Sequence, residues 1–157
     1  MLLFYSYSHR DERYRQRLEK HLAPLKREGV VSDWRDREIS AGTDWASEIS
    51  KHLDSADIIL LLISADFIAS DFCWSKEMSR ALERHSQGVA RVIPVIVQPV
   101  DWSGAPFGKL QALPKDGKPV TLWTNKEAAW VDVARGIRKA AGEVTAQKPA
   151  PPAGGQP

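Results

Sequence analysis

The chain has one cysteine, Cys73, and therefore cannot form a disulfide within itself. Its four histidines, His9, His21, His52 and His85, lack the short regular spacing of a zinc site, so no metal site is expected. A single thiol without a disulfide partner is typical of a reducing compartment. We therefore expect a cytoplasmic protein.

Neither sign of charge predominates, because 22 Lys and Arg residues are interspersed with 20 Asp and Glu residues. This balance leaves no basic patch for nucleic acid, and no nucleic-acid partner is expected. Long apolar runs are also missing: the longest, Ile58 to Ile63, cannot span a bilayer, and Met1 to Tyr5 is too short for a signal peptide. We expect neither export nor membrane insertion by signals of this chain.

The composition is that of a globular protein, with 43% apolar and 27% charged residues among 157. This length suits one domain with a core of its own. The segment from Gln147 to Pro157 holds four of the ten prolines and two glycines, and its only apolar residues are alanines and prolines. We therefore expect a domain over residues 1–142 and a flexible tail or linker over residues 143–157.

Short apolar segments alternate with amphipathic segments along the chain. Ser8 and Asp11 have the spacing of a helix N-terminal cap. The expected strands are Leu2 to Ser6, Val30 to Trp34, Ile58 to Ile63, Val92 to Val97 and Pro119 to Trp123. The expected helices cover Tyr14 to Leu25, Trp45 to Ala56, about Asp71 to Arg84, and Trp130 to Ala140. Pro94 interrupts the fourth strand and is expected to cost one ladder hydrogen bond.

This alternation predicts an α/β fold with a doubly wound parallel sheet of five strands. The segment Ile58 to Ile63 shows no polar alternation, so helices should cover both of its faces. The common five-stranded arrangement is flavodoxin-like, with strand order 2-1-3-4-5. Its connection reverses between the first and third strands, and ligands are expected in the crevice at their carboxyl ends. Tyr7 to His9, Ser64 to Ser70 and the helix carrying Glu77 should meet there, beside the charged Arg35 to Gly42 loop.

Glu77 is the acidic residue that invites a chemical role. It follows Cys73 by four residues and Trp74 by three, so one helix would place the three side chains on neighbouring faces. The carboxylate would then be half desolvated. The ordinary alternative is a solvated helix residue paired with Lys76 or Arg80.

Several motifs, in order, resemble those of Toll/interleukin-1 receptor (TIR) domains over roughly residues 1–142. Phe4-Tyr5-Ser6-Tyr7-Ser8 is similar to the first box of that family. The Arg35 to Gly42 loop leading into Trp45 resembles the second box, the BB loop, although Ser40-Ala41-Gly42 replaces a proline-glycine pair found in many receptor-type members. Ser70-x-Phe72-Cys73-x3-Glu77-Met78 resembles the segment bearing the catalytic glutamate of NAD-cleaving members, and Trp130 stands for the third box.

The resemblance implies an NAD+ hydrolase of the bacterial type with Glu77 as catalytic residue and no cofactor, NAD+ or NADP+ being the substrate. The departing nicotinamide is neutral and needs no proton, so one carboxylate suffices where ordinary glycosidases use two. Residues assigned to substrate binding are Tyr7, Ser8, His9, Ile39, Ser40, Gly42, Trp45 and Cys73. Trp45 or Trp74 is a candidate to stack on a ring of the dinucleotide, although an aromatic at helical spacing is more often part of a core.

The resemblance also implies activation by self-association through Arg35 to Gly42, in the effector module of a larger defence protein with a C-terminal sensor domain. The product is ADP-ribose or its cyclic form. A non-catalytic interaction module is the alternative. A phospho-receiver domain ranks last, because Ser6-Tyr7-Ser8 and Ser64-Ala65 stand where its acidic pair and phospho-acceptor would be.

Overall fold

The computed structural model describes residues 1–34, 51–70 and 75–147. The strands are β1 (Leu2–Ser6), β2 (Ser32–Trp34), β3 (Ile58–Ile63) and β4 (Arg91–Ile96). The α-helices are α1 (Glu12–His21), α2 (Ala23–Arg27), α4 (Ala65–Ile68), α5 (Lys76–Ser86) and α6 (Lys126–Gln147), and residues 51–55 are also helical. Short 3₁₀ helices are η1 (His9–Asp11), η4 (Lys115–Gly117) and η5 (Val120–Leu122).

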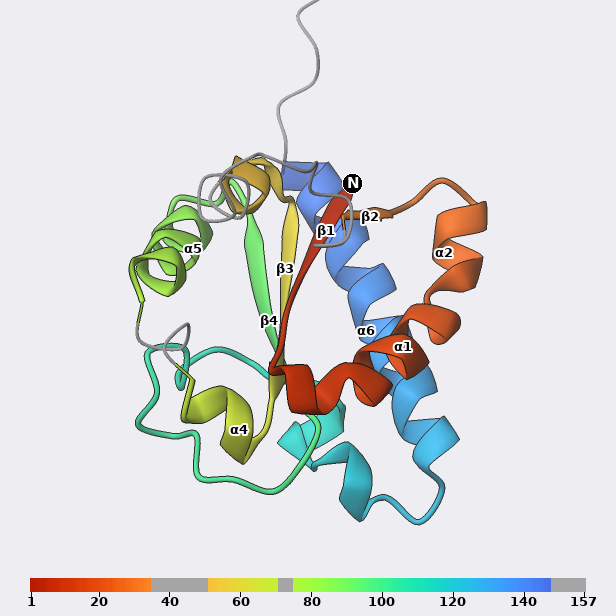
Figure 1. Ribbon diagram of the computed structural model, residues 1–157. Helices are drawn as coiled ribbons and strands as arrows, with labels where there is room; N and C mark the ends of the chain where they lie inside the picture. The colour runs from red at the N-terminus through yellow and green to blue at the C-terminus, as the bar shows by residue number, and fades with distance from the viewer. Residues whose placement is uncertain (35–50, 71–74, 148–157) are drawn as a thin grey trace, which may run out of the picture.

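The described strands form one parallel sheet in the order β2-β1-β3-β4 (Figure 1). Leu3 pairs with Asp33 of β2 on one side and with Ile58 of β3 on the other. The chain thus leaves β1 in one direction to form β2 and returns on its other side to form β3. The predicted crossover between the first and third strands is confirmed, and with it the predicted order of the first four strands.

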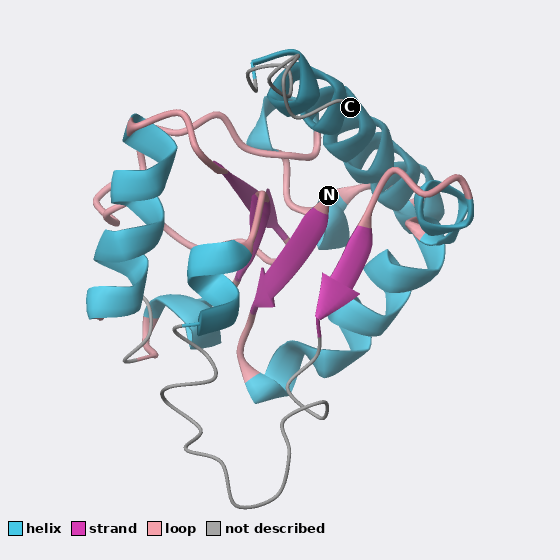
Figure 2. Cartoon of the chain, turned by 90° about the horizontal axis from the view of Figure 1, so that it is seen from above, coloured by secondary structure: helices cyan, strands magenta, loops and turns pink. Residues whose placement is uncertain are grey.

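Helices cover both faces of the sheet (Figure 2). Ile58, Leu60 and Leu62 of β3 point to the face covered by α1, α2 and α6, which we call the α6 face. Ile59, Leu61 and Ile63 point to the opposite face, covered by the helical residues 51–55, α4 and α5, which we call the α5 face. All six side chains are fully buried, as the unbroken apolar run predicts.

The first and last helices differ in extent from the sequence prediction. The expected helix over Tyr14 to Leu25 is two helices that meet at Leu22, because Pro24 supplies no N–H to continue the first. α6 continues to Gln147, and Val144 is buried, so the folded part of the chain extends past residue 142. In the described part of the chain no helix, α6 included, is long and apolar enough to cross a membrane.

The helix that carries Glu77 begins later than expected. Ser75 has an extended backbone, and its hydroxyl accepts a hydrogen bond from the Met78 N–H at 3.3 Å, so α5 begins at Lys76 and not near Asp71. A separate one-turn helix, α4, follows β3 directly, where the Ser64 hydroxyl caps the Phe67 N–H at 3.1 Å. A serine thus caps each of these two helices, and α4 is an element that the apolar pattern did not predict.

The expected fifth strand is wrong for residues 119–123, where the chain forms η5. Beyond β4 the described residues contain a single bridge, in which Leu113 donates to Pro94 O and accepts from the Ile96 N–H. The outward N–H of Val92 is bound by His85 Nδ1 at 3.0 Å, and Pro94 has no N–H. A full strand here would lack two donors, which explains why only Leu113 pairs.

The missing N–H of Pro94 leaves the β3–β4 ladder intact. The backbone N–H groups of odd-numbered residues in and after β4 point towards β3, as the hydrogen bonds from Arg91 N to Asp57 O and from Val97 N to Ile63 O show. Pro94 therefore turns its nitrogen away from β3 while its Cα pairs in register with Leu61. The expected loss of a ladder bond falls on the outer edge of the sheet.

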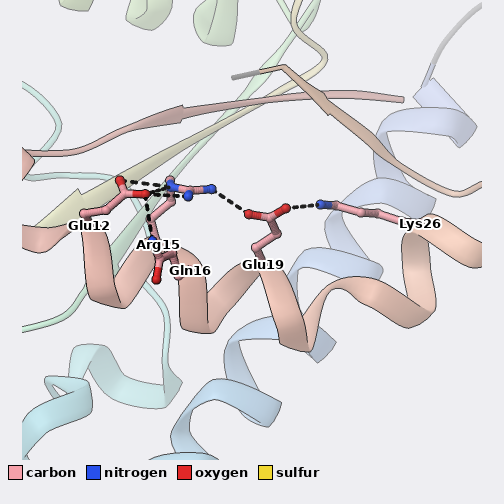
Figure 3. Close-up of polar contacts among 5 residues, drawn as sticks. All are labelled: Glu12, Arg15, Gln16, Glu19 and Lys26. Atoms are coloured by element: carbon pink, nitrogen blue, oxygen red, sulfur yellow. Dashed lines mark hydrogen bonds and ion pairs between the residues drawn. The ribbon is translucent and has the colours of Figure 1, made fainter. Parts of the chain in front are cut away.

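A chain of charged side chains stabilises α1 (Figure 3). The buried guanidinium of Arg15 contacts Glu12 at 2.6 Å and Glu19 at 2.6 Å, and Lys26 reaches Glu19 at 3.4 Å. The hydrogen bonds from Arg15 are the main cause that lowers the pKa of Glu12 to about 2, and burial opposes them. Arg15 also lies over the ring of Tyr7, at 5.6 Å from its centroid.

Glu12→Gln tests this network through its pH dependence. Because the folded-state pKa of Glu12 lies below its ordinary value of 4.5, ionised Glu12 stabilises the fold above that value, and the stabilisation is lost as pH falls towards 2. We expect the variant to be less stable at pH 7 by about 1–2 kcal/mol, a discounted figure because the side chain is 41% exposed, and equally stable near pH 2. Urea unfolding across this range measures the difference. Asp116→Asn, at an exposed position of η4 with no ion pair among the described residues, is the control, and a pH-independent deficit in Glu12→Gln would contradict the assignment.

Candidate functional site

The candidate site lies where β1 and β3 end. β1 is followed by Tyr7, Ser8 and η1, and β3 is followed by Ser64 and α4. α5 runs back along the sheet, so its first turn lies towards the same edge as α4 and the ends of the strands (Figure 1). Of the segments that the sequence assigned to the crossover crevice, Tyr7 to His9, Ser64 to Ser70 and the start of the helix carrying Glu77 therefore lie towards one edge of the sheet.

Glu77 occupies the first turn of α5 and is half-buried. Its neighbour Met78 is buried in the α5 face, so Glu77 flanks the apolar stripe as the sequence predicted. Among the residues that the structure describes, none forms a hydrogen bond or ion pair with its carboxylate. The pairing with Lys76 or Arg80 that was the ordinary alternative is not found, and Arg80 binds Asp54 at 3.1 Å. The first turn of a helix favours negative charge, because its N–H dipoles point outward.

Asp11 and Ser64 join the two loops at the crossover. The Ser64 hydroxyl donates to Asp11 Oδ2 at 2.5 Å, and the two residues are 0% and 1% exposed respectively. Burial raises the pKa of the Asp11 carboxyl. The expected role of Asp11 as a cap is not found, since its side chain makes no capping hydrogen bond. The sequence analysis did not predict this pair. The signal that could have indicated it is that Asp11 follows β1 and Ser64 follows β3, two adjacent parallel strands.

The three predicted binding residues after β1 lie in different surroundings. Tyr7 packs against the α6 face, opposite the helix that carries Glu77, and its side chain is hydrogen-bonded to Glu12. Ser8 is half-buried and accepts a hydrogen bond from the Arg10 N–H at 3.3 Å, which confirms its capping role. His9 is exposed. Alternation along β1 explains the division, because Leu3, Tyr5 and Tyr7 share one face of the sheet.

The remaining candidates, Ile39, Ser40, Gly42, Trp45 and Cys73, lie outside the described residues, as do Trp74 and the Arg35 to Gly42 loop. Within residues 1–34, 51–70 and 75–147, no group of three or more His, Cys, Asp or Glu side chains is placed to hold a metal ion. A cavity of about 820 Å³ lies along the outer edge of β4, and Glu77 is not among its lining residues. The candidate site is thus defined by Glu77, Ser8, His9 and the buried Asp11–Ser64 pair.

Comparison with known sequences identifies a family. The sequence model described as the TIR domain matches residues 3–138. The chain is also 55% identical over 151 residues to y4lF, an uncharacterized protein of Sinorhizobium fredii. That match covers 96% of this chain but 47% of the relative, so the chain spans about half the length of that protein.

Two solved structures share the fold. The TIR domain of the Toll-related receptor TRR-2 from Hydra magnipapillata superposes with a TM-score of 0.60 at 18% identity, covering 87% of this chain and 97% of the receptor domain. The TIR domains of the activated Roq1 resistosome, which directly recognizes the pathogen effector XopQ, give a TM-score of 0.52 at 18% identity, covering 94% of this chain and 84% of the other. At this identity the likeness concerns the fold alone.

Ser64→Ala tests the contribution of the buried pair at the crossover. The substitution leaves the Asp11 carboxyl in a dry site without its donor and removes the cap of α4, so we expect a loss of about 1–3 kcal/mol in the free energy of unfolding. Urea unfolding at pH 7 measures it. Ser79→Ala removes an exposed hydroxyl and should change stability by less than about 0.5 kcal/mol. Equal stability of the two variants would show that the pair contributes nothing.

Proposed function

This chain belongs to the TIR domain family, and from that premise we propose that it is an NAD+ hydrolase that cleaves the nicotinamide–ribose bond. The observation that carries the proposal is the half-buried Glu77 carboxylate, which has no partner among the described residues. Glu77 belongs to the first turn of α5, and that turn lies towards the edge where β1 and β3 end. The local sequence around it resembles the catalytic segment of NAD-cleaving TIR members. Product release as ADP-ribose or its cyclic form is compatible with this chemistry.

The reaction needs little from the protein beyond a positioned negative charge. As the bond between C1′ of the ribose and the pyridinium nitrogen breaks, its electron pair goes to the ring and nicotinamide leaves neutral. Positive charge develops on the ribose, and the Glu77 carboxylate stabilises it electrostatically. A water oxygen then bonds to C1′ and its proton passes to solvent, which gives ADP-ribose.

Recognition of the rest of the dinucleotide is part of the proposal. Ser8 and His9 open η1 beside the crossover and are candidates to contact a phosphate or ribose. Ile39, Ser40, Gly42, Trp45 and Cys73 keep their assigned roles as substrate contacts. Tyr7 faces the α6 face, so we propose that it supports the loop after β1 instead of binding substrate directly.

We propose that self-association through Arg35 to Gly42 activates the enzyme and that NADP+ is an alternative substrate. The relative from Sinorhizobium fredii is about twice as long as the matched region, which is compatible with an effector domain joined to a sensor domain. The reducing compartment expected from the single cysteine favours action in the cytoplasm.

A non-catalytic interaction module is the second candidate. One observation favours it: a glutamate in the first turn of a helix is electrostatically favourable without any catalytic duty. The two candidates differ in one measurable respect, which is the turnover of NAD+.

Glu77→Gln decides between them. The variant keeps the shape of the side chain and loses its charge, so we expect NAD+ turnover to fall by about a hundredfold or more. Cleavage of an etheno-NAD analogue, with nicotinamide release measured by chromatography, is followed at increasing protein concentration. Glu83→Gln, an exposed position on the same helix, should keep wild-type turnover. Equal rates for wild type and Glu77→Gln would remove Glu77 from catalysis, and self-association without NAD+ loss at any concentration would favour the interaction module.

A further inference from the structure

The cavity of about 820 Å³ beside β4 is distinct from the candidate site around Glu77. Four segments line it: the end of α5, the start of β4, residues 110–116 and the second half of α6. The first turn of α5 does not contribute. The volume of the cavity lies within the range of pockets that bind small organic molecules.

The backbone of β4 is closed to an added strand at this cavity. The outward-facing N–H of Val92, a lining residue, already donates to His85 Nδ1 at 3.0 Å, and Pro94 has no N–H. The bond from Val92 requires a neutral imidazole at His85, and both burial and the charge of Arg91 lower the pKa of that histidine. A peptide that pairs edge-to-edge with β4 is therefore a poor occupant, and the side chains decide what binds.

Backbone hydrogen bonds to β4 position the wall of the cavity that contains Leu113. Leu113 is fixed to β4 by two backbone hydrogen bonds of 2.8 and 2.9 Å, and its side chain packs on Gly136 of α6. A Cβ at Gly136 would lie 2.6 Å from the Leu113 methyl groups, so a larger residue at this position would displace the Leu113 side chain. The cavity is thus a formed feature of the packing between α6 and the segment before η4.

Cations from three separate elements line the cavity. They are Arg91 of β4, Lys115 of η4 and Lys139 of α6. Two acids also line it, and one of them, Glu143, is bound to Arg91 at 3.2 Å. Among the described residues neither lysine has an ion-pair partner. The remaining acid, Asp116, offsets one lysine, so the three cations and two acids of the lining leave the cavity with a net charge of +1 beside its apolar wall.

We propose that this cavity binds a small organic anion whose carboxylate, phosphate or sulfonate group lies against Lys115, Lys139 and Arg91. Its apolar body packs on Leu113 and the neighbouring apolar side chains of β4 and α6. The site is separate from the proposed NAD+ hydrolase site, and its occupancy does not depend on that activity.

Three probes that share one ring system and differ in charge test the proposal: naphthalene-2-sulfonate, naphthalen-2-ylmethanol and naphthalen-2-ylmethylammonium. Each is titrated into the ¹⁵N-labelled 157-residue chain, and amide shifts are followed by NMR. We expect saturable shifts for the sulfonate at Leu113, Gly136 and Gly88, and clearly weaker binding of the alcohol and the ammonium compound. Equal affinity for all three probes would overturn the charge argument, and shifts that centre elsewhere, or none up to millimolar probe, would overturn the site.

Lys139→Gln supplies the matched test on an exposed helix position where folding is not at risk. We expect the sulfonate to bind about two- to fivefold more weakly, as the loss of one exposed charge implies, and Lys115→Gln to add a similar factor. Lys20→Gln, an exposed position on α1 away from the cavity, should bind like wild type. Unchanged affinity in both cavity variants, or an equal loss in Lys20→Gln, would show that the sulfonate is only an adventitious ligand drawn by overall charge.

Discussion

The burial of β3 on both faces is the constraint on which the rest of this structure depends. Six consecutive apolar side chains from Ile58 to Ile63 are fully removed from water, and they divide evenly between two cores. A strand buried in this way needs helices above and below the sheet, which in turn requires the chain to cross from one side of β1 to the other. The crevice between β1 and β3, and hence the location of the candidate site, is a consequence of that crossing.

The crossover needs a polar contact at its base as well as apolar cover. There the loops after β1 and β3 approach each other in a dry environment, where an unpaired polar group would be costly. The Ser64 hydroxyl satisfies two polar groups there, because it donates to Asp11 and also accepts a hydrogen bond from the Phe67 N–H in the first turn of α4. The hydrogen bond between Ser64 and Asp11 also holds the end of η1 against the start of α4. Shape at the candidate site therefore rests on two residues with no assigned chemical role.

The outer edge of the sheet shows how local polar groups limit a fold. A fifth strand was expected from Pro119 to Trp123, and Val120 of that segment does lie in the core of the α6 face, whereas Leu122 is exposed. The strand does not form because β4 offers too few outward donors: His85 occupies one and Pro94 lacks another. Leu113 takes the one position that remains. The space that a regular strand would fill is left as the cationic cavity beside β4.

The amino-acid sequence by itself determined the class of fold, the order of its first four strands, the burial of β3 on both faces and the position of Glu77 beside an apolar stripe. These features follow from hydrophobic periodicity, which is a property of neighbouring residues. Tertiary structure decided the rest: the pairing of Asp11 with Ser64 and the replacement of the fifth strand by η5. Each of these depends on which polar groups, distant in sequence, meet without water, and a pattern of neighbours carries no information about that meeting.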